Sequence, residues 1–165
     1  MFQDWEKLQT EAKSAYFLGL CDTITPRVKQ SKGYKYIIAA LDSCWQWVIE
    51  KNVEADDLYF HLEKLEDTGV LTLMQFPENE ENLDVWVCVA DALLFTIYSA
   101  YKYQGDEYLP ETVESTDNEE LFAEFQNHFK VANMNSVRLE KNLMESLKDL
   151  DLKRSLREDI RKILS

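Results

Sequence analysis

One long apolar stretch, residues 83–103, constrains the fold of this chain more than any other feature. Over most of its length only Asp91, Thr96 and Ser99 interrupt the apolar and aromatic side chains. A helix built from this stretch would have no polar face, and a helix that is apolar all round is typically buried. A bilayer span needs about 20 apolar residues, and this stretch carries a carboxylate midway along its length. We therefore expect it to be the central helix of a soluble bundle.

Signals at both ends place this central helix at about residues 83–104. The acidic residues from Glu78 to Asp84 precede it, and negative charge is favourable near the start of a helix because of the helix dipole. Gly105 follows it and suits the left-handed backbone conformation that often ends a helix.

The composition predicts an all-α fold. A chain of 165 residues can bury one substantial core but is short for two domains, and four glycines and three prolines provide few turns for a β fold. Cys21, Cys44 and Cys88 lie in apolar helical patterns without Cys-x-x-Cys spacing, so we expect buried free thiols in a reducing compartment. We predict a single domain over residues 1–165, a bundle of seven to eight helices around the central one.

Apolar residues at helical spacing predict the other helices. The expected elements are a five-turn helix from Trp5 to about Leu20, then helices at Tyr34–Val48 and Ala55–Leu65, a short helix or packed loop at Val70–Phe76, a helical turn from Pro110 to Val113, a helix opened by a capping box at Asp117 and running to Ala132, and two C-terminal helices separated near Asp149 to Asp151. Trp45 and Trp47 are expected in the core.

The negative charge of the chain is concentrated in its middle third. Residues 65–129 hold 15 acidic residues and one basic residue, Lys102, whereas residues 1–64 and 130–165 have net charges of only −2 and +3. The electrostatic field of such a concentration of negative charge repels nucleic acid and anionic membranes and accelerates encounter with a cationic protein. The simpler interpretation is a solvated acidic face that aids solubility.

We take this acidic block as the candidate partner-binding surface, with the exposed aromatic residues Tyr103 and Tyr108 as further contacts. Its candidate residues are Glu78, Glu80, Glu81, Asp84, Asp106, Glu107, Glu111, Glu114, Asp117, Glu119 and Glu120. No nucleic-acid or membrane partner is expected.

Few residues suggest catalysis. His61 and His128 have no nucleophile or ligand set at a recognisable spacing, so we expect structural roles for both, with no metal and no cofactor. Asp84 and Asp91 are seven residues apart and share one helix face, which would suit acid–base or metal chemistry.

The preferred interpretation of Asp91 is structural. A buried carboxylate needs donors, and we expect them from the indole of Trp45 or Trp47, from a tyrosine hydroxyl such as that of Tyr16 or Tyr34, or from the amides at a helix N-terminus. Asp91→Ala should then cost about 1–3 kcal/mol by stranding a donor. Asp42, one turn before Trp45, is interpreted in the same way.

Several sequence segments together resemble a known family. They are Ala12-x-x-Ala-Tyr-Phe-Leu-Gly-Leu-Cys-Asp, Leu41-Asp-Ser-Cys-Trp-Gln-Trp, Asp91-Ala-Leu, Ala100-Tyr-Lys-Tyr-Gln-Gly and Leu109-Pro-Glu-Thr-Val-Glu. Over roughly residues 5–125 the layout is similar to an all-α family of bacterial immunity proteins from polymorphic-toxin and contact-dependent systems, the sixth-numbered immunity family. A more distant likeness is to uncharacterised bacterial helical proteins that pair a Trp-rich second helix with an Asp-Ala core helix.

The resemblance implies a non-enzymatic antitoxin that binds a cognate toxin domain and blocks it. With the charge map, the expected toxin is cationic, and a nuclease is one candidate class. The N-terminal residues contain no basic and apolar signal-peptide pattern, so we expect a cytoplasmic protein. The alternatives are an acidic helical adaptor that binds another basic protein, and a metal-dependent enzyme that uses Asp84 and Asp91.

Overall fold

The computed structural model describes residues 1–64 and 66–165, and within them the chain is helical without any strand. The all-α prediction is therefore confirmed for the described residues. In that part of the chain the elements are α1 (Phe2–Glu6), α2 (Thr10–Ile24), η1 (Thr25–Val28), α3 (Tyr34–Glu50), α4 (Ala55–Leu62), α5 (Val70–Leu73), η2 (Pro77–Asn82), α6 (Leu83–Gln104), α7 (Glu111–Glu114), α8 (Asn118–Ala132), α9 (Ser136–Leu147) and α10 (Leu156–Leu164), where η marks a 3-10 helix.

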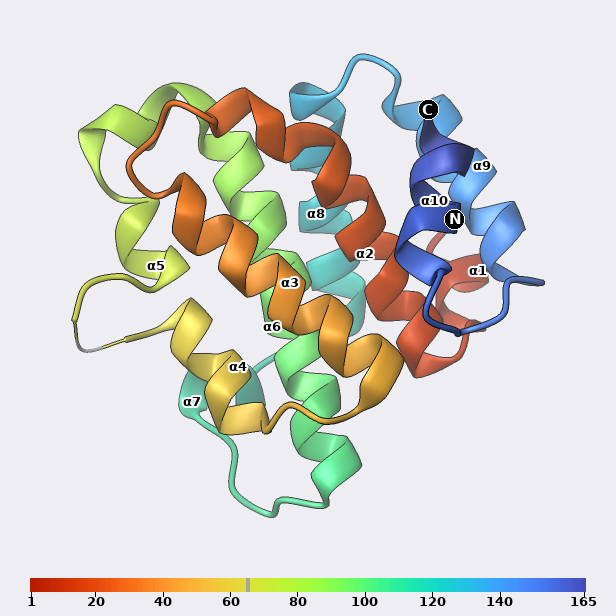
Figure 1. Cartoon of the computed structure of the whole chain (residues 1–165), viewed down its shortest axis with the longest axis horizontal. Helices are drawn as coiled ribbons and strands as arrows, with labels where there is room; N and C mark the ends of the chain where they lie inside the picture. The colour runs from red at the N-terminus through yellow and green to blue at the C-terminus, as the bar shows by residue number, and fades with distance from the viewer. Residues whose placement is uncertain (65) are drawn as a thin grey trace.

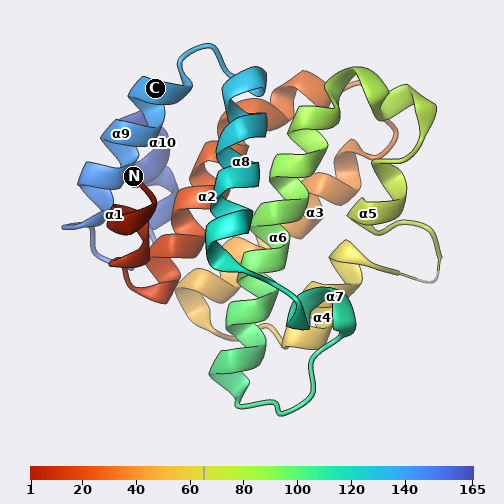
Figure 2. The same ribbon diagram turned by 180° about the vertical axis from the view of Figure 1, so that it is seen from behind.

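Helix α6 lies at the centre, as the apolar stretch predicted. It contacts α2, α3, α4, α5, α7 and α8, and Figures 1 and 2 show these helices on different sides of it. By length and composition alone the segment Pro77–Gln104 could cross a membrane, but 72% of its apolar window is buried by the rest of the chain. This burial is typical of a core helix in a folded domain.

The end of α6 is set by local chemistry. Gly105 adopts a left-handed conformation with φ of 76°, which costs glycine little because it has no side chain. The Asp106 N–H then donates to the carbonyl oxygen of Tyr101 at 3.2 Å, satisfying one of the carbonyl groups that a helix end leaves free. The predicted C-cap is therefore present.

Helix α8 runs antiparallel to α6 and packs along it (Figure 2). It begins at the predicted capping box, where the Asp117 carboxylate accepts a hydrogen bond from the Glu120 N–H at 3.0 Å. The Cys88 thiol donates to the Phe125 carbonyl oxygen at 3.8 Å across the two helices. The same packing brings Asp84 and Asp91 of α6 close to polar side chains of α8.

The N-terminal helix differs from the prediction. The chain breaks after α1, and α2 starts at Thr10, so the expected five-turn helix is two helices. The Trp5 indole N–H donates to the Lys13 carbonyl oxygen at 3.3 Å, although eight residues of straight helix would separate them by about 12 Å. The break lets α1 fold back, and Trp5 is fully buried against Phe17, Phe95 and Phe122.

Other boundaries also differ in detail. The described residues contain ten α-helices where seven to eight were expected, because short helices such as α1, α5 and α7 carry weak sequence signals. The expected third helix ends at Leu62 rather than at Leu65, and Leu65 itself lies outside the described residues. The ambiguous segment after Gly69 forms the short α5, as one of the two expected alternatives. Trp45 and Trp47 are buried in the core as predicted.

Candidate functional site

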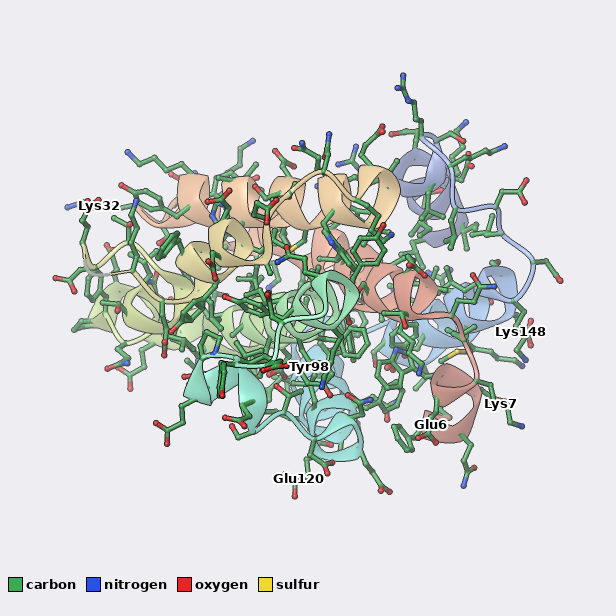
Figure 3. The ribbon with its side chains drawn as sticks, turned by 90° about the horizontal axis from the view of Figure 1, so that it is seen from below. Glu6, Lys7, Lys32, Tyr98, Glu120 and Lys148 are labelled. Atoms are coloured by element: carbon green, nitrogen blue, oxygen red, sulfur yellow. The ribbon has the colours of Figure 1, made fainter. Side chains whose placement is uncertain are left out.

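The predicted acidic residues occupy three separate places on the structure. We name them the η2 group (Glu78, Glu80 and Glu81), the loop group (Asp106 and Glu107) and the α7–α8 group (Glu111, Glu114, Asp117, Glu119 and Glu120). All ten side chains are exposed. Figure 3 shows Glu120 on the outer side of α8, pointing away from the helices.

The acidic block does not form one continuous patch. The η2 group precedes α6 and the loop group follows it, and a helix of 22 residues is about 33 Å long. Figure 2 shows α6 running between these two ends, with α7 and the start of α8 beside its second half. The α7–α8 group is therefore the largest of the three local clusters of negative charge.

The eleventh candidate, Asp84, has a partner inside the protein. Its Oδ1 lies 2.6 Å from His128 Nδ1, and both side chains are about one-third exposed. This pairing joins the first turn of α6 to the last turns of α8. Asp84 is thus a contact between helices, and its carboxylate is less available to an external partner than the ten exposed acids.

Asp91 is buried but does not have the donor that we predicted. Its side chain is only 4% exposed, and Oδ2 has no hydrogen-bond partner. Trp45 Nε1 is likewise without a partner, and the Tyr16 hydroxyl donates to Glu140 instead. The prediction that Asp91 accepts a hydrogen bond is therefore wrong, because the register of α8 brings a carboxylate, Glu124, to this position.

The protonation of Asp91 follows from this environment. The pKa of Asp91 is raised to about 9, chiefly by burial and then by the hydrogen bond to Glu124 and the negative charge of Glu124. The group is therefore neutral at pH 7, and its proton can be donated to the Glu124 carboxylate. Glu124 lies on the exposed side of α8, so the pair connects the core to the surface.

Two adjoining hollows lie over this carboxyl pair. Both are lined by Asp91, Leu94, Thr112 and Glu124, and their volumes are about 180 and 200 Å³. The rest of the first, which we name the outer hollow, is mostly polar and includes Asp117 and Glu120 of the α7–α8 group. The rest of the second, which we name the inner hollow, is apolar and includes Leu62, Leu71 and Met74. Sequence reasoning missed this site, because Asp91 and Glu124 come together only through the packing of α8 on α6.

A second buried acid, Glu140, was also missed. Its Oε1 accepts hydrogen bonds from the Tyr16 hydroxyl at 2.9 Å and from Gln126 Nε2 at 3.2 Å. Burial raises the pKa of Glu140, although both hydrogen bonds oppose that shift. With two donors this carboxylate is satisfied, and it joins α9 to α2 and α8. In the sequence, Glu140 lies among the leucines of an amphipathic helix, and nothing in that pattern indicated that it would be buried.

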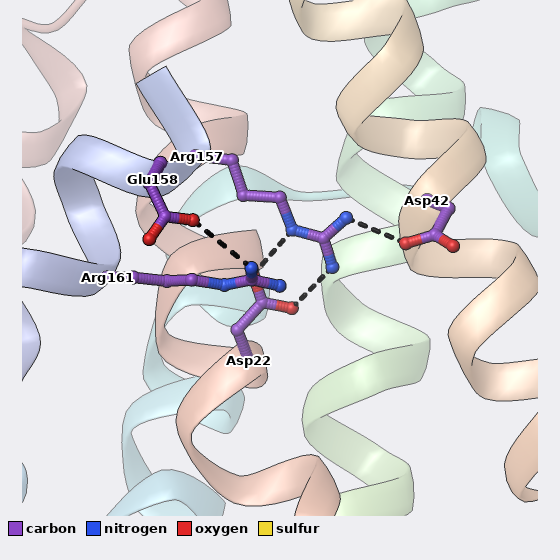
Figure 4. Close-up of polar contacts among 5 residues, drawn as sticks. All are labelled: Asp22, Asp42, Arg157, Glu158 and Arg161. Carbon is purple, nitrogen blue, oxygen red and sulfur yellow. Dashed lines mark hydrogen bonds and ion pairs between the residues drawn. The ribbon is translucent and has the colours of Figure 1, made fainter. Parts of the chain in front are cut away.

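Arg157 forms the most extensive ionic contact among the described residues (Figure 4). Its Nε and Nη2 donate to the two carboxylate oxygens of Asp22 at 3.0 Å each, and Nη1 donates to Asp42 Oδ1 at 2.7 Å. The guanidinium also lies 5.6 Å from the ring centroid of Trp45. Asp42 is therefore held by an ion pair at the surface and is not the buried anchor that we expected.

Replacing Arg157 with methionine should destabilise the fold by about 1–3 kcal/mol. The change keeps an unbranched apolar stem but removes a bidentate contact whose Asp22 partner is largely buried. The matched control is Arg154→Met. The Arg154 side chain is 90% exposed, so its ion pair with Glu50 should contribute little to stability. Urea unfolding of both variants measures the difference, and equal midpoints would contradict the structural role of Arg157.

The residues considered for catalysis do not all lie together in the described structure. In residues 1–64 and 66–165, no three His, Cys, Asp or Glu side chains converge as metal ligands, and Asp84 and Asp91 have separate neighbours. His61 Nε2 lies 3.1 Å from Ser43 Oγ, a contact that sequence spacing did not reveal. This pair joins α3 to α4, and neither residue lines the hollows at Asp91.

Comparison with known proteins places most of the chain within one family model. The family model described as Immunity protein Imm6 matches residues 12–132, which is more than half of the chain and extends from the start of α2 to the end of α8. No curated protein and no solved structure matches the chain significantly.

Proposed function

Because the chain belongs to the Imm6 family of immunity proteins, we propose that it neutralises one cognate toxin domain by binding it stoichiometrically. The family match is the observation that carries this proposal. The toxin domain is cationic, with a nuclease as one candidate class, and the protein acts without catalysis in the cytoplasm of a bacterium that uses a polymorphic-toxin or contact-dependent system. Neither nucleic acid nor membrane is a partner.

The surface chemistry supports a cationic partner. The ten candidate acidic side chains are all exposed, and they belong to a segment that carries only one basic residue, Lys102. The aromatic side chains of Tyr103 and Tyr108 are 62% and 90% exposed beside the loop group, and tyrosine is frequent among the contacts that dominate binding energy. We therefore place the toxin against the second half of α6 and the α7–α8 group.

The proposal is tested with the toxin gene expected next to the gene for this protein. The toxin domain is expressed in cells with and without this chain, and the purified pair is examined by light scattering and calorimetry. We expect rescue of growth and a complex of fixed stoichiometry. The assignment fails if the chain neither protects the cells nor binds the purified toxin domain.

The electrostatic part of the proposal has its own test, which compares two matched triple variants. Glu111, Glu114 and Glu119 are changed to lysine in one, and Glu78, Glu80 and Glu81 in the other, so that net charge changes equally. The α7–α8 variant should slow association with the toxin severalfold at low salt, and the difference should shrink as salt screens the charges. The η2 variant should slow it much less. Equal rates for both variants and the parent would mean that the acidic block only aids solubility.

A further inference from the structure

We propose that the two hollows at Asp91 receive an arginine side chain of the toxin, with its guanidinium paired to Asp91 and Glu124. This inference rests on the proposed function and specifies the site at which the partner is held. It assigns the contact to one place on α6, α7 and α8, whereas the exposed acids alone spread over three places.

The first argument is that Asp91, whose carboxyl group meets the Glu124 carboxylate, receives no hydrogen bond at Oδ2 from an N–H or hydroxyl group of the protein. More than nine in ten buried polar groups in folded proteins have a hydrogen-bond partner, yet Asp91 Oδ2 has no donor. The side chain is 4% exposed and still lines both hollows. A ligand that enters the hollows with N–H groups would supply the donor that the chain itself does not provide.

The second argument is the charge and shape of the site. Asp117, Glu120 and Glu124 line the outer hollow, and no lysine, arginine or histidine among the described residues lines either one. The inner hollow is bounded by Leu62, Leu71 and Met74, which suit the apolar stem of a long side chain. Volumes of about 180 and 200 Å³ give each hollow room for several water molecules, which an entering side chain would displace.

Arginine fits these features better than lysine. Its planar guanidinium presents five N–H donors and can bridge two carboxyl groups, whereas an ammonium group acts as a compact, strongly hydrated point charge. Asp91 and Glu124 form such a pair of acceptors on adjacent helices. The guanidinium is also weakly hydrated, which favours its transfer from water to a partly apolar site.

Binding should be linked to the proton on Asp91. The acidic or thiol groups that face it are Glu124 and Glu120 from α8, Asp117 at the start of α8, Cys21 from α2 and Cys88 from α6 itself. Helices α4 and α5 contribute apolar side chains to the hollows, and α7 contributes Thr112, whose hydroxyl donates to Glu63 Oε1. A cation placed among these groups favours the ionised form of Asp91, so the proton leaves to solvent and binding strengthens as pH rises towards 9.

The site can be tested without the toxin, using N-acetyl-arginine amide as the probe and N-acetyl-citrulline amide as its neutral match. The titration of the Asp91 carboxyl group is followed through the NMR signal of its carboxyl carbon in the presence of each probe. Near saturation, the arginine probe should lower the titration midpoint by at least about one pH unit, and the citrulline probe should not move it. Asp91→Asn should abolish the chemical-shift changes at Leu94 and Thr112, and Glu78→Gln, in the η2 group, should retain them.

Two results would overturn the inference: equal responses to the two probes, or arginine-induced shifts that persist in Asp91→Asn. With the toxin in hand, the double variant Asp91→Asn, Glu124→Gln should bind at least tenfold more weakly than the parent, whereas Glu78→Gln should bind normally. If the double variant binds and protects as well as the parent, the arginine site is wrong and the immunity function stands. If the parent itself fails to bind the toxin, the function is wrong, and the probe titration still decides whether the hollows bind a guanidinium.

Discussion

Replacing Asp91 with asparagine is expected to make the protein more stable than the parent at pH 8, with an advantage that grows with pH. The unfolded chain releases the Asp91 proton near the ordinary pKa of about 3.9, whereas the folded protein holds it to a pKa of about 9. Folding therefore takes up one proton between these values, and the free energy of unfolding falls by up to about 1.4 kcal/mol per pH unit as pH rises. Below pH 4 both states are protonated and this loss is absent.

Asparagine removes the titration and keeps the shape of a protonated aspartate. Its amide can donate to the Glu124 carboxylate as the protonated carboxyl group does. Between pH 6 and pH 8 the stability difference between Asp91→Asn and the parent should grow by about 3 kcal/mol, a large part of the 5–15 kcal/mol typical of a folded domain.

The measurement is urea unfolding followed by tryptophan fluorescence at several pH values. Glu124→Gln is the companion variant, because it removes the neighbouring charge and should shift the loss of stability to a lower range of pH. If the curves of the parent and of Asp91→Asn stay parallel from pH 5 to pH 9, Asp91 is not the titrating group. The Asp91→Ala cost predicted from the sequence no longer has its stated cause, because no donor is left unpaired.

The second large effect is expected at Trp5. Changing Trp5 to alanine should destabilise the fold by about 3–5 kcal/mol, because the indole is fully buried and lies 5.2 Å, centroid to centroid, from each of Phe17, Phe95 and Phe122. The matched control is Phe60→Ala, an aromatic deletion at a half-exposed position that should change stability by less than about 0.5 kcal/mol.

Thermal and urea unfolding of both variants test this prediction. An equal and small effect of the two deletions would mean that α1 is not part of the cooperative fold. Trp5 lies outside the residues that match the Imm6 family, as do Glu140 and Arg157. Each of these three residues connects a helix outside the matched range to the matched helices through buried or ionic contacts.

The sequence by itself determined the helices and many of their ends. The apolar stretch predicted α6 because a helix without a polar face must be covered on all sides, and Gly105 and the Asp117 capping box marked ends correctly. These features depend on residues within a few positions of one another, so their physical causes are present in the local sequence. The break between α1 and α2 was missed, because the burial of Trp5 against three phenylalanines involves residues far along the chain.

Only the tertiary structure decided which polar groups meet. The sequence predicted that the Asp91 carboxyl group would be buried. The packing of α8 on α6 then placed Glu124 beside it, and not an indole or a hydroxyl group. In the same way Asp84 met His128, and Arg157 met Asp22 across 135 positions of sequence. Charge and periodicity are properties of single segments, whereas a hydrogen bond or an ion pair requires two atoms within about 3 Å. That distance is set by how helices pack against one another, and side-chain shape throughout the core determines that packing.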